Sequence, residues 1–169
     1  KELKKNFWYT HVSIYLLKED YLHIGAQIGY PEETMFRKIH ISQGVHWRTV
    51  KTRKVQFIQD VTKEPIYLPA DYNISSEICV PLLKDNIVLG TINVEGSADS
   101  PLTQSDVDML STLAIPIALA VDNARLHAQV REMAMTDAVS GLSNRHAFEE
   151  TLNAEVERAT RFGHHLSLI

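Results

Sequence analysis

The sequence predicts an α+β fold, in which an antiparallel sheet carries helices on its faces and a long helix follows the last strand. In residues 11–28 and 77–95, apolar and polar residues alternate around a short polar turn, which is the pattern of a β-hairpin. After Thr103 the apolar residues instead recur at spacings of three and four, which is the pattern of one helix face. Two hairpins and an amphipathic helix can share one core when the helix covers the sheet.

The first hairpin has an apolar side that includes Val12, Ile14 and Leu16, and a second side of mixed character. The polar residues 18–20 predict its turn, because Lys, Glu and Asp interrupt the apolar alternation there. A sheet with one apolar side buries that side against another layer of structure.

Short elements are predicted between the two hairpins. Residues 38–42 and 55–59 are typical of short strands, and residues 45–52 predict a short helix. Residues 60–73 contain two prolines and lack periodicity, so they predict a loop with about one helical turn.

The second hairpin has arms at 77–83 and 87–95, joined by Lys84-Asp85-Asn86. Asp and Asn favour this turn because their short polar side chains tolerate the left-handed backbone angles of tight turns.

The long helix is predicted to begin at Thr103, which forms an [ST]-x-x-[DE] capping box with Asp106. Pro116 lies inside the helix, removes one backbone hydrogen bond and predicts a bend. The apolar face that is expected to pack on the sheet consists of Val107, Leu110, Ala114, Ile117, Val121 and Ala124.

Beyond Asn123 the helix becomes more polar, yet Leu126, Val130 and Met133 continue a four-three spacing. This spacing is typical of a short coiled-coil seam. We therefore expect the chain to form a parallel homodimer through Leu126, Val130 and Met133.

The composition argues against several classes of partner. The chain has 169 residues, is 44% hydrophobic and 22% charged, and carries a net charge of -4, so a nucleic-acid partner is not expected. The longest apolar run, 113–121, is too short to cross a bilayer, so we expect a cytoplasmic chain without membrane contact. Cys79 is the only cysteine and lies in an apolar run, which predicts a buried, reduced thiol.

Residues 8–130 resemble a GAF domain, a sensory α+β module. The resemblance is carried in order by the hairpin at 11–28, the Gly44-Val45 step into a helix, Asp60-Val61 followed by Pro65 and Tyr67, the run SEICVPLLKDNIVLGTINVEG at 76–96, and Leu102-Thr103 leading to VDNARL at 121–126. The resemblance implies a sensor that binds a small molecule between one sheet face and the segment that covers it.

Residues 137–148 resemble the start of a GGDEF domain, the catalytic module of diguanylate cyclases. The residues that carry the resemblance are Asp137, Val139, Ser140, Gly141, Leu142, Asn144, Arg145, His146 and Phe148. In that family the metal-binding aspartates and the GG[DE]EF loop follow later, so we expect no catalytic residues in this chain. The resemblance implies a parent enzyme that converts two GTP to cyclic di-GMP with magnesium, and no cofactor for the fragment itself.

The expected organisation therefore has three parts. Residues 1–130 are expected to form a GAF sensory domain whose N-terminal helix is truncated, residues 120–136 a connecting signalling helix, and residues 137–169 an incomplete start of a GGDEF domain. The expected function is a regulatory, small-molecule-sensing and dimerising module of a diguanylate cyclase.

The candidate ligand-binding residues lie mainly in the segment expected to cover the sheet. They are His46, Trp47, Asp60, Tyr67, Tyr72 and Cys79. Aromatic walls with a few convergent polar groups are typical of small-molecule pockets. The alternative is that these aromatic residues only cap the core.

Two other functions remain open from the sequence. SEICVPL at 76–82 also resembles the methionine-sulfoxide-reductase branch of the GAF family, which implies a stand-alone enzyme, although that chemistry requires several cysteines. The chain could instead be a purely structural dimerisation module. No metal site is expected, because no two histidines have the i, i+4 spacing of helical metal ligands.

Overall fold

The structure is a computed structural model, and it describes residue 9 and residues 11–31, 36–69, 73–137, 140 and 142–167. The chain divides into two compact units, Lys1–Asp122 and Asn123–Ile169.

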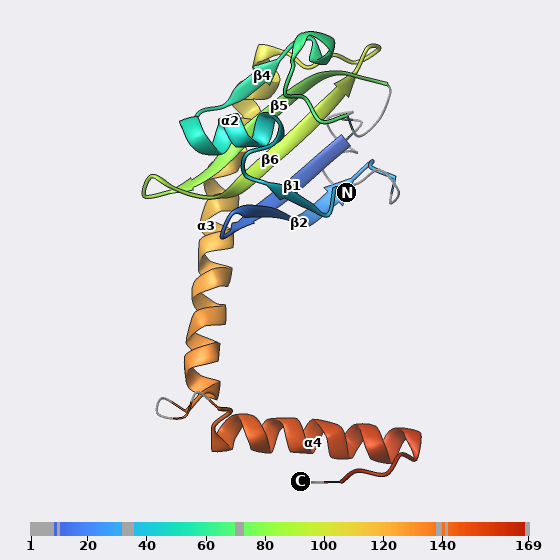
Figure 1. Cartoon of the computed structure of the whole chain (residues 1–169), viewed down its shortest axis with the longest axis vertical. Helices are drawn as coiled ribbons and strands as arrows, with labels where there is room; N and C mark the ends of the chain where they lie inside the picture. The colour runs from blue at the N-terminus through green and yellow to red at the C-terminus, as the bar shows by residue number, and fades with distance from the viewer. Residues whose placement is uncertain are drawn as a thin grey trace. The chain divides into compact units, whose positions relative to one another are not determined.

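The first unit is built on a six-stranded antiparallel sheet with the strand order β3-β2-β1-β6-β5-β4 (Figure 1). The strands are β1 (His11–Lys18), β2 (Tyr21–Ile28), β3 (Lys38–His40), β4 (Gln56–Ile58), β5 (Ile74–Lys84) and β6 (Ile87–Ser97). The α+β fold and both hairpins are thus as predicted, and β1 and β6 pair in the centre of the sheet.

The hairpin turns use left-handed backbone angles. Glu19 has a φ of 55° in the first turn, and Asp85 and Asn86 have φ values of 48° and 67° in the second. β5 and β6 run longer than predicted, because Ile74 and Ser76 continue the ladder with Ser97 and Gly96. Serine and glycine carry little strand propensity of their own, so at these positions the partner strand decides the conformation.

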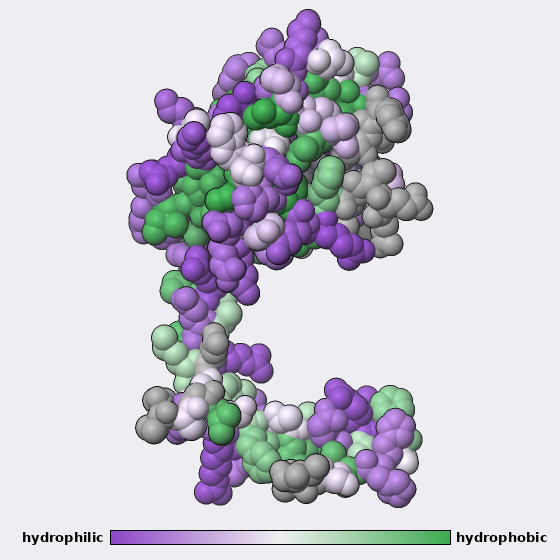
Figure 2. Space-filling view, viewed as in Figure 1, coloured by the Kyte–Doolittle hydropathy of each residue, from purple (hydrophilic) through white to green (hydrophobic). Residues whose placement is uncertain are grey.

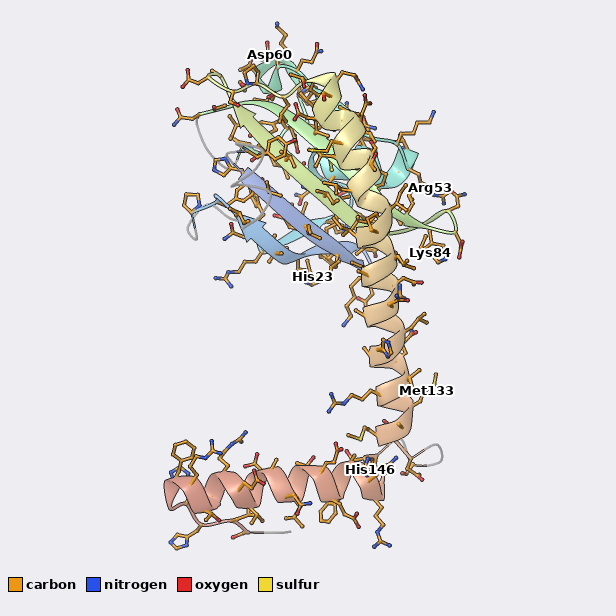
Figure 3. The ribbon with its side chains drawn as sticks, turned by 180° about the vertical axis from the view of Figure 1, so that it is seen from behind. His23, Arg53, Asp60, Lys84, Met133 and His146 are labelled. Atoms are coloured by element: carbon orange, nitrogen blue, oxygen red, sulfur yellow. The ribbon has the colours of Figure 1, made fainter. Side chains whose placement is uncertain are left out.

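One face of the sheet is apolar and is covered by the inner part of α3 (Gln104–Met135), which lies in front of the sheet in Figure 3. Strand alternation directs the same-face residues toward this helix. The core there consists of Val12, Ile78, Val80, Leu82, Leu89, Ile92, Val94, Leu110, Ala114 and Ala118. The predicted capping box is present, since the Thr103 amide donates to Asp106 Oδ2 at 2.7 Å.

The opposite face carries the short helix α2 (Gly44–Thr52) and a 3-10 helix, η1 (Val61–Lys63), as Figure 1 shows. Gly44 starts α2 with a φ of 69°, and a Cβ at this position would lie 2.9 Å from Leu68 Cδ1. A glycine is therefore needed where the start of α2 meets the segment after η1.

The second unit contains α4 (Arg145–Phe162) and the turn that precedes it. Asn144 caps α4 by accepting from the Ala147 amide at 3.0 Å. Asp137 Oδ1 accepts from the amide and the hydroxyl of Ser140, which closes the turn. Arg145 pairs with Glu149 at 2.8 Å, so this motif arginine supports its own helix.

The apolar side chains of α4 are poorly covered in the second unit, as expected. Phe148 is 44% exposed and Val156 is 46% exposed, and Leu152 is half-buried. An exposed apolar stripe of this kind marks a surface that is normally covered.

Candidate ligand cavity

The sheet face under α2 is polar, although most residues of the strands that form it are apolar. Alternation places every second side chain of three central strands on this face. These side chains are His11, Ser13 and Tyr15 from β1, Glu77 and Cys79 from β5, and Thr91, Asn93 and Glu95 from β6. Polar side chains that are buried in a domain need hydrogen-bond partners. A binding site is therefore expected on this face of the sheet.

A small cavity of about 20 Å³ lies between this face and its cover. Glu77, Asn93 and Glu95 form part of its floor, and Tyr30 and His46 form part of its wall. A cavity of that size holds a group about as large as a water molecule. It is far smaller than the several hundred Å³ of a typical small-molecule pocket.

Two carboxylates face each other on the cavity floor. Glu77 and Glu95 are direct partners across β5 and β6, and they are 3% and 2% exposed. Burial raises the pKa of Glu77 well above its ordinary value, and the neighbouring Glu95 raises it further. Burial and the second carboxylate therefore favour a protonated Glu77.

Two acceptor atoms of the floor lack a hydrogen-bond donor within the described part of the chain. They are Glu77 Oε2 and Asn93 Oδ1, and both are buried. The Asn93 side chain lowers the pKa of Glu77, although burial and Glu95, which raise it, have larger effects. Two unsatisfied acceptors beside a second carboxylate are best satisfied by a small group with several hydrogen-bond donors.

Tyrosine hydroxyls surround Glu95. The Tyr67 hydroxyl donates to Glu95 Oε1 at 3.2 Å, and Tyr30 lines the same cavity. Burial, followed by the nearby Glu95, raises the pKa of Tyr30 well above its ordinary value, so this phenol stays a neutral donor.

The cover is held together by an ion pair between α2 and the segment after η1. Arg48 contacts Glu64 through two nitrogens, with Arg48 Nη2 at 2.6 Å from Glu64 Oε2. Arg48 also lowers the pKa of Glu77, although burial has the larger, opposite effect. Glu64 raises the pKa of Glu77, so the two charges of the pair act on the floor in opposite directions.

Cys79 and His46 lie together beneath α2. Cys79 Sγ is 3.4 Å from His46 Nδ1, which also lies 2.9 Å from Thr91 Oγ1. Burial lowers the pKa of His46 to about 4 and raises that of the Cys79 thiol. Both groups are therefore neutral at pH 7, and this pair lacks the thiolate that nucleophilic chemistry needs.

The structure brings together three of the residues predicted to bind a ligand. His46 lines the cavity, Cys79 packs against His46, and Tyr67 reaches Glu95 on the floor. No group of three His, Cys, Asp or Glu side chains in the described ranges could hold a metal ion.

The other predicted residues lie elsewhere. Trp47 is half-buried on α2, with Lys51 Nζ 4.8 Å from its ring centre, and it does not line the cavity. Asp60 lies at one end of the unit (Figure 3), where it caps η1 and pairs with Lys63 at 2.8 Å. Tyr72 lies outside the described residues.

Glu77, Asn93 and Glu95, which form part of the cavity floor, were not predicted from the sequence. The second hairpin contains a pattern that could have predicted them. Two carboxylates and one amide occupy alternate positions on one face of strands that are otherwise mostly apolar. Glu and Asp are almost never fully buried unless they are paired, so two of them inside central strands indicate a site.

Residues 7–122 match the GAF domain family, and the chain belongs to this family. The match ends before residues 137–148, and no GGDEF domain is found. No curated protein sequence matches the chain.

Solved structures share the fold. The type II free methionine-R-sulfoxide reductase from Thermoplasma acidophilum is 27% identical, with a TM-score of 0.66 over 72% of this chain and 85% of that protein. The free methionine-R-sulfoxide reductase from Neisseria meningitidis, solved with its substrate, is 24% identical, with a TM-score of 0.64 over 75% and 74%. The GAF domain of a phosphoenolpyruvate-protein phosphotransferase from Coxiella burnetii is 13% identical, with a TM-score of 0.68 over 75% and 80%.

Proposed function

We propose that this GAF domain is a regulatory receptor for a small molecule with a primary ammonium group, and that free amino acids are its ligand class. The observation that carries this proposal is the pair of unsatisfied acceptors, Glu77 Oε2 and Asn93 Oδ1, beside the buried carboxylate of Glu95. An ammonium group has three donors and no acceptor, so it can serve all three groups at once.

The charge balance supports a cation. Two ionised carboxylates side by side in a buried site repel each other, so burial and Glu95 raise the Glu77 pKa, and a proton on Glu77 relieves the repulsion. A bound ammonium group relieves it without the proton. Ligand binding therefore exchanges one positive charge for another at the same place.

The cavity volume requires the cover to move. About 20 Å³ accommodates the ammonium group alone, so the rest of an amino acid has to displace part of the cover. Tyr67 and the Arg48–Glu64 pair are the contacts that such a displacement would change. A change in this cover is the first step by which occupancy becomes a signal.

The named substrate of two similar structures has this chemistry. Free methionine-R-sulfoxide is an α-amino acid, and the reductases from Thermoplasma acidophilum and Neisseria meningitidis are named for it. We take this compound and its parent amino acids as the first candidates for the present cavity.

A stand-alone reductase of that type is the less favoured function. The chain has one cysteine, and Cys79 is fully buried with a raised pKa. A thiol reductant that reduces a sulfoxide leaves an oxidised sulfur, which a second thiol normally resolves. This chain can therefore hold such a ligand but lacks the thiols to turn it over.

We further propose that the domain regulates a diguanylate cyclase through paired helices. The residues 137–148 motif supports this parent enzyme, whose missing catalytic module would take GTP and magnesium. Leu126, Val130 and Met133 are 51%, 64% and 79% exposed within the second unit, and they remain the proposed homodimer seam. The sequence that follows residue 169 in the parent gene tests this assignment, because a cyclase needs metal-binding aspartates and a GG[DE]EF loop there.

The proposal also places the chain in the cytoplasm, without nucleic acid or membrane as partner. A purely structural dimerisation module is the remaining alternative. It requires a cavity that stays closed to all small molecules.

Thermal unfolding of the full chain tests the ligand class. Free amino acids and methionine-R-sulfoxide are compared with their N-acetyl forms, in which a neutral acetamido group replaces the ammonium group, and with their α-hydroxy acid forms, in which a hydroxyl group of similar size replaces it. A ligand at a hundred times its Kd stabilises the folded state by about 2.7 kcal/mol. The proposal predicts stabilisation by a free form but not by its N-acetyl or α-hydroxy acid form, and loss of the effect in Glu77→Gln. Equal stabilisation by the free form and its α-hydroxy acid form, or no stabilisation by any of the free amino acids, would refute it.

A further inference from the structure

A second hollow lies on the other face of the sheet, beside the inner part of α3. It is a surface groove of about 350 Å³, which is within the range of small-molecule pockets. β4 pairs with β5 only at residues 77–79, so the following residues of β5 form an open edge, and the groove lies between this edge and α3. Its lining consists of Arg53, Lys54, Val55, Val80, Pro81, Leu83, Ser111, Ala114 and Ile115.

The floor and the rim of the groove are apolar. Val80 and Ala114 form its floor, and both are buried in the core between the sheet and α3. Leu83 and Ile115 form its rim, and they are 36% and 71% exposed. Figure 2 shows apolar surface near the turn between β5 and β6, the end of β5 at which Leu83 lies. A ligand in the groove would remove this apolar surface from water, which favours binding.

Two cations stand at one wall of the groove, where α2 ends. Arg53 follows α2 with a left-handed φ of 56°, Lys54 comes next, and Figure 3 shows Arg53 beside α3. Among the described residues, neither of these side chains forms an ion pair. The Ser111 hydroxyl, which also lines the groove, donates to the Val107 carbonyl at 2.6 Å. The free side-chain donors of the groove are therefore both positively charged.

We propose that this groove binds an amphipathic anion, a molecule with a carboxylate head and an unbranched apolar chain, of which a medium-chain fatty acid is the type. The carboxylate accepts hydrogen bonds from Arg53 and Lys54, and the chain covers the apolar floor between Leu83 and Ile115. A water molecule occupies about 30 Å³ in the liquid, so the groove holds about ten to twelve non-hydrogen atoms, which is the size of octanoate.

The site does not depend on the ammonium-binding cavity. That cavity lies on the opposite face of the sheet and has Glu77 and Glu95 on its floor, which repel a carboxylate. The two hollows therefore select ligand groups of opposite charge, and one domain could respond to two compounds.

A peptide strand is a less suitable occupant of the groove. The open edge of β5 could accept a further strand, but Pro81 lies in this edge and has no N–H to donate.

A membrane is the second alternative occupant. α3 is long and apolar enough to cross one, with a mean hydropathy of 1.4 over its most apolar window. A bilayer surface contacts what protrudes and leaves a recess between α3 and β5 unfilled, whereas a single acyl chain fills it.

An NMR titration of the isotope-labelled full chain with monomeric octanoate tests the site. The amide signals of Arg53, Lys54 and Ile115 should shift and saturate. Octanoate should bind at least about tenfold more tightly than butyrate, because its four additional CH₂ groups cover apolar surface. 1-Octanol keeps the chain without the charge and octyltrimethylammonium reverses the charge, so both should bind at least about threefold more weakly than octanoate.

Variants separate the charged wall from the apolar rim. Lys54→Glu should weaken octanoate at least about threefold but leave 1-octanol unchanged, because it alters the charge and not the apolar walls. Ile115→Ser should weaken both ligands, and the domain should stay folded by circular dichroism because this side chain is exposed. Lys51→Glu and Ile87→Ser are the matched controls, since both residues are exposed and neither lines the groove, and they should keep wild-type affinity.

The two ligand sites can fail separately. Glu77→Gln lies in the other cavity and should leave octanoate binding unchanged, whatever it does to amino acids. Equal affinity for octanoate, 1-octanol and octyltrimethylammonium, or no saturable shift with octanoate, would overturn the groove proposal. Shifts at Arg53 and Ile115 with phosphatidylserine vesicles but not with monomeric octanoate would assign the surface to a membrane and also overturn it.

Discussion

Glu77→Gln should change how the stability of the domain depends on pH. The folded protein holds the Glu77 proton to a higher pH than the unfolded chain does, because the carboxyl group is buried opposite Glu95. Between the two pKa values the folded state binds more protons, so the free energy of unfolding falls as the pH rises. The fall begins near the unfolded glutamate value of about 4.3 and ends at the raised folded pKa.

The size of the effect follows from this linkage. One proton difference corresponds to about 1.4 kcal/mol per pH unit. For a urea slope of about 2 kcal/mol/M, the unfolding midpoint of the wild-type chain should fall by up to about 0.7 M per pH unit from this group alone. Glutamine keeps the shape of the protonated acid and does not titrate, so Glu77→Gln should lose this contribution.

Urea unfolding followed by circular dichroism at pH 5, 6 and 7 measures the difference between the two chains. Glu157→Gln is the matched control, because Glu157 lies exposed on α4, and it should keep the wild-type pH dependence. If Glu77→Gln and the wild type show parallel curves, Glu77 does not titrate in this window, and the account of the cavity floor is wrong.

Three further outcomes are expected. Gly90→Ala should cost about 3 kcal/mol or more of unfolding free energy, because a Cβ there would lie 2.0 Å from the Tyr15 carbonyl oxygen, and a loss below 1 kcal/mol would contradict this packing. Cys79 should react with a thiol reagent only after denaturant is added, and rapid labelling of the folded chain would show that the thiol is accessible. Asn144→Ala should destabilise α4 by about 1 kcal/mol through loss of its cap, and circular dichroism should show less helix. Asn123→Ala should not have this effect.

The order of elements could be predicted because each has a local signal. The two hairpins follow from alternation around polar turns, and α3 follows from its capping box and its helical spacing. The extra residues of β5 and β6 could not be predicted, because Ser76 becomes strand only through its pairing with Gly96 of β6.

The site was harder to predict because it depends on contacts between distant segments. The composition of the covering segment predicted His46 and Tyr67, which contact the cavity residues, and also Trp47 and Asp60, which contact Lys51 and Lys63 instead. The cavity floor depends instead on strand register, which sets Glu77 opposite Glu95. Register follows from pairing across the sheet and not from the residues of one strand alone.

The central claim is that the acidic floor of the GAF cavity binds an ammonium group, and a crystal structure of the chain with a stabilising free amino acid tests it most directly. The account predicts the ligand nitrogen within hydrogen-bond distance, about 2.7–3.2 Å, of Glu77 Oε2 and Asn93 Oδ1, with Glu95 beside it and the Tyr67 contact changed. A ligand bound elsewhere, or one whose carboxylate and not its ammonium group faces Glu77 and Glu95, would contradict it.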